Sequence, residues 1–453
     1  MFSPVTPACC ADRYEPSIRQ DRGVNSVVSS QQIIPELQWR GLIAQSTDLE
    51  ELSKVCANPV TLYCGFDPTA PSLHLGNLVQ VLTVRRFQQH GHKPLALIGG
   101  ATGLIGDPKE SGERTLNSVD LVGEWVERIR VQLERFYEFD GSNSARMVNN
   151  LEWTQDLNAI EFLRDIGKHF SVNRMLDREA VSARLAKDGI SFTEFSYQLL
   201  QSFDYLELYR RYNCVLQTGG SDQWGNITAG VDLVRRVEAK GVHALTTPLL
   251  TRADGKKFGK TESGTIWLDP GLTSPYSFFQ YWINADDRDI SNLLKTFSFK
   301  SESEINELLQ ASIERPQERA GQRALASELT ELVHGAAERA GAEDAGKALF
   351  GGGDLADLPE STLSAALTEA SLGEVDTSEV VDGKLPTLDE LLVRCGLAPS
   401  KKAARRTIAE GGAYVNNLRV DQEDFQVPVS ELLYGQWVVL RRGRKAFAGV
   451  VVK

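Results

Sequence analysis

Short apolar runs and helical repeats alternate in the first half of the chain, and together they predict a parallel sheet. Residues 60–66 (VTLYCGF) and 94–100 (PLALIGG) are apolar and rich in β-forming side chains, so each predicts a buried strand. Between them, apolar residues recur with the spacing of one helix face: Leu75, Leu78, Val79, Leu82 and Phe87. We therefore expect a strand–helix–strand unit, with the helix at about 76–90, in a parallel sheet covered by helices.

The same pattern returns further along the chain. Residues 215–220 (VLQTGG) predict a later strand, and a helix from about 225 to 237 follows it. In such sheets, ligands bind beyond the carboxyl ends of the strands. The loops at that edge span 66–76, 99–107 and 217–224, and we expect the functional residues there.

The second half of the chain has a different pattern. Residues from about 275 to 350 are helical and charged, and the stretch FGGGDLADLPES ends that pattern. Residues 369–384 suggest a flexible acidic linker. From residue 386 onward, two helical stretches precede short β-rich runs such as GQWVVLRRG, so we expect a separate unit.

Composition places the chain among soluble globular proteins. It has 453 residues, 42% of them hydrophobic and 24% charged. No apolar run is long enough to span a membrane, and the first 30 residues do not resemble a signal peptide. The six cysteines form no C-x-x-C pair, which favours a reducing cytosol without structural disulfides or zinc. We expect a cytoplasmic protein with no membrane partner and no metal site.

The net charge of −12 is unevenly distributed. Between residue 386 and the C-terminus, 11 Lys and Arg outnumber 7 Asp and Glu by 4, so the remaining chain carries −16. A basic tail on an acidic body indicates that the tail, rather than the body, meets a polyanion.

The stretch GKKFGKTESGTIW (255–267) superficially resembles a phosphate-binding P-loop. However, only three residues separate Gly255 from Gly259, where a P-loop needs four. The segment also runs into a short predicted strand, Thr265–Leu268, and not into a helix. If it binds phosphate, it does so with mobile lysines; the alternative is a solvated basic turn.

The stretch GFDPTAPSLHLGN (65–77) leads into the first predicted helix. Thr69 and His74 flank the helix N-terminus, whose free N–H groups and partial positive charge suit a phosphate. Gly76 lets a large group such as an adenine ring approach the backbone. The alternative is a simple strand–turn–helix connection with an N-terminal cap.

The stretch SFTEFSYQLLQSFDY (191–205) predicts a helix with one polar face. Tyr197, Gln201 and Asp204 share that face, because they are spaced i, i+4 and i+7. They could form a pocket wall that accepts an ammonium group and a phenol hydroxyl. The alternative is an ordinary amphipathic helix with a wet side.

Two glycine-rich loops add further polar groups. QTGGSDQWGN (217–226) closes a strand and then presents Asp222 and Gln223; a carboxylate there suits ribose hydroxyls, and a plain polar loop is the alternative. GGATGLIGDP (99–108) presents Asp107. It does not match the dinucleotide fingerprint G-x-G-x-x-G, which disfavours a nicotinamide cofactor.

Together with KFGKT, these stretches resemble the bacterial tyrosyl-tRNA synthetases, a family of class I aminoacyl-tRNA synthetases. HLGN (74–77) looks like the HIGH signature of that class, and KFGKT (257–261) looks like its KMSKS loop. The other motifs match the family in order: TLYCGFDPTAPSLHLGN, GGATGLIGDP, GISFTEFSYQLLQSFDY and GGSDQWGNITAG. The resemblance covers roughly residues 34–453.

The resemblance implies an α/β fold with a Rossmann-like parallel-sheet catalytic domain, a helical anticodon-binding domain and a C-terminal S4-like α+β RNA-binding domain. With it we divide the chain into five parts: a disordered N-terminal extension (1–33), the catalytic domain (34–255), the KMSKS-like loop with the anticodon-binding domain (256–350), a helical and linker segment (351–385) and the S4-like domain (386–453).

The resemblance also implies a tyrosine pocket. Tyr63 and Asp204 would hold the phenol hydroxyl, and Asp107, Tyr197 and Gln201 would hold the ammonium group. Gln223 would hold the region of the substrate carbonyl. No editing domain is visible, so selection against phenylalanine would depend on this pocket.

For ATP, a substrate that acts with Mg²⁺, the resemblance implies two sets of residues. Ribose, adenine and phosphate contacts would come from Cys64, Gly65, Asp67, Gly76, Asn77, Gly220, Asp222 and Lys260. The catalytic groups around the γ-phosphate and pyrophosphate would be Thr69, His74, Lys257, Lys260 and Thr261. Tyrosine would be joined to AMP and then transferred to the 3′ end of tRNA(Tyr). The family also implies a homodimer.

The basic tail would bind the tRNA. Lys401, Lys402, Arg405 and Arg406 lie on successive turns of a predicted helix, an arrangement that suits phosphates better than bases. A charged solvent-facing helix is the alternative.

The sequence departs from the family pattern at three places. Asn77 replaces the histidine that often closes the HIGH signature, and Phe258 and Gly259 replace the methionine and first serine of KMSKS. The loop 107–115 is one residue shorter than in some relatives; we expect Arg114 to face phosphate, and the role of Lys109 stays open.

Two rival interpretations remain at this point. A tryptophanyl-type synthetase shares the catalytic fold, but Tyr63 with Asp204 disfavours it because indole has no hydroxyl group. An RNA-binding protein that has lost amino-acid activation is disfavoured by the presence of Asp204, His74 and the loop lysines.

Overall fold

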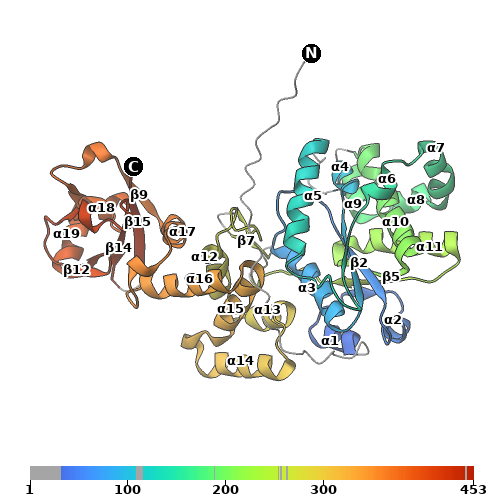
Figure 1. Cartoon of the computed structure of the whole chain (residues 1–453), viewed down its shortest axis with the longest axis horizontal. Coiled ribbons are helices and arrows are strands. Elements are labelled where there is room, and N and C mark those ends of the chain that lie inside the picture. Colours follow the sequence, from blue (N-terminus) through green and yellow to red (C-terminus); the bar gives the residue numbers. More distant parts are fainter. Residues whose placement is uncertain are drawn as a thin grey trace, which may run out of the picture.

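The predicted strands form one mainly parallel sheet (Figure 1). The structure is a computed structural model that describes residues 32–108, 116–187, 189–253, 255, 258–261, 264–443 and 446–453, without the side chains of residues 179, 180, 260 and 261. Five strands run parallel: β2 (Thr61–Phe66), β3 (Lys93–Ile98), β4 (Arg146–Asn149), β5 (Cys214–Gly220) and β6 (His243–Thr247). Strand β1 (Gln45–Ser46) pairs antiparallel with β6, which gives the order β1-β6-β5-β2-β3-β4. The prediction of a helix-covered parallel sheet is confirmed.

Helices cover both faces of this sheet because successive strand residues point to opposite sides. Leu62 and Phe66 of β2 pack with α3 (Leu75–Gln89) and α5 (Val119–Leu133) in one core. Tyr63, between them, belongs to a second core with α10 (Phe192–Tyr212) and α11 (Trp224–Glu238). Tyr63 therefore lies on the α10 side of the sheet, the side that also carries Asp204.

Several short elements surround this core. They are α1 (Ile33–Trp39), α2 (Leu49–Val55), α4 (Thr102–Ile105), α6 (Leu151–Thr154), α7 (Ala159–Glu161), the π-helical turn η2 (Phe162–Ile166), α8 (Val172–Leu176) and α9 (Glu179–Leu185). The group between β4 and α10 has no strong apolar periodicity, and the sequence analysis did not predict it. The predicted extension 1–33 lies outside the described residues, except for its last two.

A helical domain follows the parallel-sheet domain. It contains α12 (Pro275–Ile283), α13 (Ile290–Phe297), α14 (Glu302–Glu314), α15 (Ala320–His334), α16 (Ala336–Leu349) and α17 (Glu360–Ala370). Ser274 caps α12 with its hydroxyl, and Pro275 occupies the first helical position, where it needs no N–H partner. In Figure 1 this domain lies between the parallel-sheet domain and the C-terminal domain.

The C-terminal domain combines helices α18 (Leu388–Arg394) and α19 (Lys401–Ala409) with two small sheets. The larger sheet has the order β12-β11-β14-β15-β9 and consists of β12 (Leu418–Val420), β11 (Ala413–Val415), β14 (Trp437–Arg442), β15 (Ala446–Val452) and β9 (Leu372–Val375). The smaller sheet pairs β10 (Lys384–Thr387) with β13 (Gln426–Pro428).

The segment 369–384 differs from the flexible linker that its acidic composition suggests. Residues 372–375 form β9, which pairs in parallel with β15, the last strand of the chain. Glycine accounts for part of this fit: a Cβ on Gly449 of β15 would lie 2.7 Å from the Cβ of Leu367 on α17. The segment is therefore part of the C-terminal sheet and holds α17 against it.

Candidate active site

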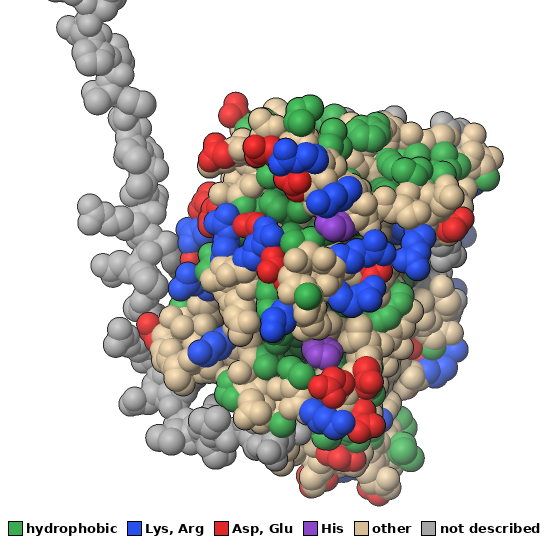
Figure 2. All heavy atoms as spheres, turned by 90° about the vertical axis from the view of Figure 1, so that its right-hand side faces the viewer, with side chains coloured by type: hydrophobic (Ala, Val, Ile, Leu, Met, Phe, Trp, Pro, Cys, Tyr) green, Lys and Arg blue, Asp and Glu red, His purple; other side chains and the backbone are tan. Residues whose placement is uncertain are grey.

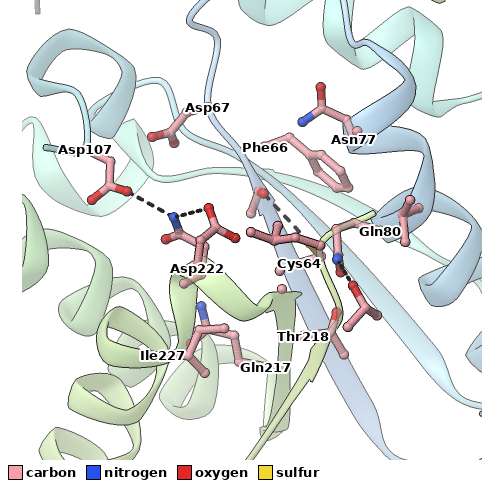
Figure 3. A pocket seen from close by; sticks show the side chains of 18 of the residues that line it. Cys64, Phe66, Asp67, Asn77, Gln80, Asp107, Gln217, Thr218, Asp222 and Ile227 are labelled. Atoms are coloured by element: carbon pink, nitrogen blue, oxygen red, sulfur yellow. Dashed lines mark hydrogen bonds between the residues drawn. The ribbon is translucent and has the colours of Figure 1, made fainter. Parts of the chain in front are cut away.

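A cavity of about 610 Å³ opens at the carboxyl ends of β2, β3 and β5 (Figure 3). The three loops singled out in the sequence meet there. The predicted site residues that line the cavity are Tyr63, Cys64, Gly65, Asp67, Thr69, His74, Gly76, Asn77, Asp107, Tyr197, Gln201, Asp204, Gly220, Asp222 and Gln223. Lys257, Lys109 and Arg114 lie outside the described residues. Lys260 and Thr261 form the backbone of strand β7 (Lys260–Thr261).

One end of the cavity holds a buried carboxylate beside a buried phenol. Asp204 is 2% exposed; its Oδ2 accepts a hydrogen bond from Asn150 Nδ2 (3.0 Å) and its Oδ1 accepts one from Trp153 Nε1 (2.8 Å). Burial raises the pKa of Asp204 to about 7, although the two donors act to lower it. The hydroxyl of Tyr63 is buried, and among the described residues it has no hydrogen-bond partner. This end can therefore bind a polar group that both donates and accepts a hydrogen bond, such as a hydroxyl.

Asn150 and Trp153 were not found by the sequence analysis. Both follow β4 directly, in the sequence NNLEW, and Asn150 is fully buried. A polar pair directly after a strand at the ligand edge is a usable signal, but β4 itself is short and was not predicted.

The opposite wall of the cavity is rich in negative charge. Tyr197 Oη donates to Asp67 Oδ2 (2.7 Å). Asp107 accepts hydrogen bonds from Gln223 Nε2 (3.0 Å) and Asn226 Nδ2 (3.1 Å). Figure 3 shows Asp67 and Asp107 on the same side of the pocket. Two carboxylates with a nearby phenol can bind an ammonium group by charge and hydrogen bonds.

The polar face of α10 is not the wet side of an amphipathic helix. Tyr197 and Asp204 are buried, and Gln201 is partly buried with a side-chain oxygen that lacks a hydrogen-bond partner among the described residues. This face lines the cavity, so the wall inferred from the helical spacing is present. Ser191 caps the helix by accepting a hydrogen bond from the Glu194 N–H group.

The N-terminus of α3 reaches the cavity from the other side. His74 is its N-cap: Nδ1 accepts hydrogen bonds from the Gly76 N–H (3.0 Å) and the Asn77 N–H (3.4 Å), while Asn77 Oδ1 accepts one from the His74 N–H (3.1 Å). Because Nδ1 accepts, a neutral His74 ring carries its hydrogen on Nε2. A Cβ on Gly76 would lie 2.8 Å from the His74 ring, so this glycine accommodates the imidazole. The N-terminal cap that the sequence left as an alternative is therefore present and occupies the N–H groups of Gly76 and Asn77, so a phosphate at this end would meet Nε2 of His74 and the helix dipole.

The ribose candidates, Cys64 and Asp222, lie between the acidic wall and the N-terminus of α3 (Figure 3). At Gly220 a Cβ would overlap the carboxylate of Asp222, so glycine lets that side chain fold back over the strand end. Burial raises the pKa of the Cys64 thiol to about 12, which keeps the group neutral and limits it to weak hydrogen bonds.

The FGKT segment is anchored by its first two residues. Phe258 packs in an aromatic cluster with Tyr281, Trp282 and Phe297 of the helical domain. Gly259 has φ +76°, and a Cβ there would lie 3.1 Å from the Cβ of Leu75 at the start of α3. The predicted strand Thr265–Leu268 is only partly formed, since β8 (Gly264–Thr265) pairs with β7 and Trp267 bridges to His74. The segment is therefore held against the α3 N-terminus and is not an isolated basic turn.

A second hollow, of about 500 Å³, lies beside the first and is basic. His169, Arg174, Arg178 and Arg236 line it. Arg178 contacts Gly225, where a Cβ would lie 3.1 Å from its Nε, and interacts electrostatically with Asp107. Figure 2 shows Lys and Arg side chains gathered over the middle of this face of the molecule. The sequence analysis missed this group because its members are scattered over residues 169–236.

The basic residues of the C-terminal helix are mostly paired with acids. In α19, Lys401 pairs with Glu390, Arg405 with Asp389 and Arg406 with Glu410, each at 2.8 Å. Lys402 is exposed. The pairs of Lys401 and Arg406 lie at the surface, where ion pairs are weak and can exchange for another anion, whereas Asp389, the partner of Arg405, is buried.

Among the described residues, no helix could span a membrane, and no group of three metal-ligating side chains is present.

Comparison with known proteins gives the family. Residues 56–351 match the family described as tRNA synthetases class I (W and Y), and residues 368–450 match the tyrosine–tRNA ligase SYY-like C-terminal domain. The chain is 62% identical over 423 residues to the tyrosine–tRNA ligase of Streptomyces avermitilis, covering 93% of this chain and 99% of that protein. It is 58% identical over 421 residues to that of Mycobacterium tuberculosis, covering 92% and 98%.

Solved structures agree. A C-terminally truncated mitochondrial tyrosyl-tRNA synthetase from Coccidioides posadasii is 31% identical, with TM-score 0.62, covering 68% of this chain and 90% of that one. A similar protein from Aspergillus nidulans is 29% identical, with TM-score 0.63, covering 69% and 95%. The fold and the cavity therefore define a class I aminoacyl-tRNA synthetase of the tryptophan and tyrosine group. Within that group, the chain belongs to the tyrosine–tRNA ligases.

Proposed function

We propose that this enzyme joins L-tyrosine to AMP from ATP, releases pyrophosphate and then transfers tyrosine to the 3′ end of tRNA(Tyr). The observation that carries the proposal is the buried pair Tyr63 and Asp204 at one end of the cavity. The other walls of the cavity carry the carboxylates of Asp67 and Asp107 and the N-terminus of α3. A tyrosine molecule has matching groups: a hydroxyl at one end and an ammonium group at the other.

In the proposed binding mode, the phenol hydroxyl donates to Asp204 and accepts from Tyr63. The ammonium group is held by Asp107, Tyr197 and Gln201. Phenylalanine has no hydroxyl group and would leave the buried Asp204 carboxylate without that hydrogen-bond partner. An unpaired buried charge weakens binding more than the loss of an apolar contact does.

The activation step needs positioning and charge neutralisation. A tyrosine carboxylate oxygen attacks the α-phosphorus of ATP, the bond to the bridging oxygen breaks, and pyrophosphate leaves with the electron pair; no proton has to move. Thr69 and the Nε2–H of His74 neutralise the leaving phosphates together with the positive end of the α3 dipole, and Lys257, Lys260 and Thr261 are further donors. Cys64 and Asp222 hold the ribose, Gly65, Asp67, Gly76, Asn77 and Gly220 complete the nucleotide site, and Gln223 holds the substrate carbonyl region.

ATP enters as its Mg²⁺ complex in this proposal. Magnesium is usually bound by substrate phosphates and waters with few protein carboxylates, which fits a phosphate region made of a helix N-terminus and a lysine-bearing loop. When bound, the ion supplies further neutralisation of the phosphate charge.

For the transfer step, the ribose hydroxyl at the end of the tRNA attacks the adenylate carbonyl and releases AMP. We propose that the acceptor arm crosses the basic hollow at Arg174, Arg178 and Arg236, and that the helical and C-terminal domains bind the rest of the tRNA, with Lys401, Lys402, Arg405 and Arg406 on its phosphates.

We also propose that the enzyme is a homodimer. Large apolar side chains are exposed on the parallel-sheet domain: Leu116, Val119, Ile160, Leu163 and Phe192, between 54% and 75% exposed. They belong to the region of α5, α7, η2 and the start of α10. Figure 2 shows hydrophobic side chains over the upper part of one face of the molecule. An apolar area of this kind marks an interface. Phe192→Asp should shift the protein to a monomer in sedimentation experiments; an unchanged dimer would place the interface elsewhere.

The cytoplasm is the proposed compartment. Each of the four cysteines that the structure describes is buried and outside any disulfide, as expected in a reducing environment.

An amino-acid-dependent ATP–pyrophosphate exchange assay tests the proposal. We expect exchange with tyrosine and little with tryptophan or phenylalanine. Exchange with tryptophan alone would identify the other enzyme of the group, and no exchange would support an RNA-binding protein without activation.

A further inference from the structure

A chain of hydrogen bonds joins the two ends of the tyrosine pocket. At the acidic wall, Tyr197 Oη donates to Asp67 Oδ2 (2.7 Å), and Thr102 Oγ1 donates to Asp67 Oδ1 (2.7 Å). The amide nitrogen of Asn150 then donates to Thr102 Oγ1 (3.0 Å) and to Asp204 Oδ2 (3.0 Å). The chain therefore connects Tyr197, which faces the ammonium group, to Asp204, which faces the phenol.

The acceptors along this chain fix the direction of each hydrogen bond. The Asn150 side-chain oxygen accepts a hydrogen bond from the Ala101 N–H group (2.7 Å), which fixes the orientation of the amide. Its two N–H hydrogens then point to Thr102 and Asp204. Because Thr102 Oγ1 accepts from Asn150, its single hydrogen is available for Asp67. Thr102 is 2% exposed, so water does not replace these partners at low cost.

The backbone is shaped to make room for this junction. A Cβ on Gly99 would overlap both the Oδ1 of Asp67 and the Oγ1 of Thr102. The glycine-rich stretch that begins at Gly99 thus serves to bring Asp67 and Thr102 together, a use that the sequence motif alone did not reveal.

We propose that Thr102 is a positioning residue that couples the ammonium end of the pocket to its phenol end and so contributes to selection of tyrosine over phenylalanine. The inference rests on the proposed function. Thr102 holds Asp67 for Tyr197 on one side and orients Asn150 for Asp204 on the other. Loss of its hydroxyl removes one acceptor of the Asn150 amide and one hydrogen bond to Asp67, so both ends of the pocket lose part of their fixed geometry.

The test compares Thr102→Val with Thr102→Ser and with Thr83→Val. Thr102→Val is close to isosteric and removes the hydroxyl, whereas Thr102→Ser keeps it. Thr83 is a buried threonine whose hydroxyl donates to Val79 O in its own helix, so Thr83→Val removes a buried hydroxyl elsewhere. The readouts are KM for tyrosine, KM for ATP, kcat of exchange and the ratio of kcat/KM for tyrosine to that for phenylalanine.

For Thr102→Val we expect KM for tyrosine to rise roughly tenfold, by more than KM for ATP, together with a lower tyrosine-to-phenylalanine ratio. Thr102→Ser should restore both values, and Thr83→Val should leave them as in the wild type. An unchanged KM for tyrosine and an unchanged ratio in Thr102→Val would overturn the inference, as would an equal effect in Thr83→Val.

A double-mutant cycle distinguishes coupling from a general loss of stability. Thr102→Val combined with Tyr197→Phe should weaken tyrosine binding less than the sum of the two single changes, because both act through Asp67. Additive effects would overturn the coupling. If Thr102→Val does not fold, Thr102→Ala removes the same hydroxyl with less steric demand. A wild-type enzyme without tyrosine-dependent exchange would instead refute the proposed function.

Discussion

At the scale of single residues, the cavity is marked by buried polar atoms that the protein itself does not pair. Among the described residues, the hydroxyl of Tyr63 and the side-chain oxygens of Gln201 and Gln217 have no hydrogen-bond partner, and all three residues line the cavity. Leaving such groups unpaired is costly, and in this cavity a ligand can provide the missing partners. Around them, Asp67, Asp107 and Asp204 are already held by other side chains and are fixed before the substrate arrives.

The raised pKa of Asp204 gives tyrosine recognition a pH dependence. Above about pH 7 the group is a carboxylate, which accepts the phenol hydrogen in a charge-assisted bond; as the pH falls through about 7, it is protonated and that bond weakens. We expect kcat/KM for tyrosine, measured by exchange with saturating ATP, to decrease toward acid pH with a midpoint near 7.

Asp204→Asn should lower kcat/KM for tyrosine by at least roughly tenfold and remove that acid limb. Glu207→Gln is the matched control, because it changes a carboxylate on the same helix that pairs with Arg210 and Arg211 instead. Near-normal exchange in Asp204→Asn would show that the phenol site is misplaced.

Helical spacing predicted the pocket residues that share one element, the family resemblance supplied Tyr63 and Asp107 from other elements, and neither pointed to Asn150 or Thr102. Tyr197, Gln201 and Asp204 follow from helical spacing alone. Asn150 and Thr102 come from other segments, and only the packing of β4 and α4 beside α10 places them next to Asp204 and Asp67. No local sequence pattern encodes a contact between segments that are far apart in the chain.

At the scale of elements, α3 and the FGKT segment work as one unit. The segment crosses the start of α3: the Leu75 N–H group donates to Ile266 O (3.2 Å), and the Gly259 N–H group donates to the hydroxyl of Tyr281 (3.1 Å). The replacement of the usual methionine and serine by Phe258 and Gly259 fits this arrangement, since the ring fills an aromatic cluster and a side chain at position 259 would be crowded by Leu75 and strained by the positive φ.

Gly259→Ala should therefore reduce the rate of tyrosine activation by more than the strain in its backbone alone would. We expect a decrease in kcat of exchange of about tenfold, with little change in tyrosine affinity, because the added Cβ pushes the segment away from α3. Gly255→Ala is the control: Gly255 has a similar φ of +78°, but no atom of the described residues lies within 4 Å of its Cβ position. Equal effects of the two substitutions would contradict the role given to the Leu75 contact.

Element boundaries show where composition misleads. The acidic stretch 369–384 suggested a linker, yet β9 within it pairs with β15, where Leu372 lies opposite Gly449, 77 positions later in the chain. The pairing is long-range, and strand β9 has only four residues, so local pattern could not reveal it. By contrast, β2, β3 and β5 were found because fully buried parallel strands are continuously apolar.

At the scale of the whole molecule, an acidic catalytic body and a basic C-terminal domain are joined through helices. Asn417 donates to Ala348 O (2.7 Å), Phe350 packs edge-on against Phe447, and α17 contacts both α12 and β15. These contacts place α19 at the far end of the molecule from the cavity (Figure 1). In the proposed binding mode, the acceptor end of the tRNA and its contacts with α19 therefore lie far apart on one chain.

Removing exposed cations from α19 should affect aminoacylation without affecting activation. We expect Lys402→Ala with Arg406→Ala to raise KM for tRNA severalfold and to reduce the salt dependence of binding, while pyrophosphate exchange stays unchanged. Lys347→Ala, which removes an exposed and acid-paired cation from α16, is the control. Normal charging by the double variant would place the tRNA on another surface.

The measurement that tests the central claim most directly is a crystal structure of this enzyme with tyrosine and a non-hydrolysable ATP analogue. We predict that the phenol oxygen lies within hydrogen-bond distance of Tyr63 and Asp204, that the ammonium group contacts Asp107, Tyr197 and Gln201, and that the phosphates lie at His74. A tyrosine ring bound elsewhere, or with its hydroxyl turned away from Asp204, would contradict the account.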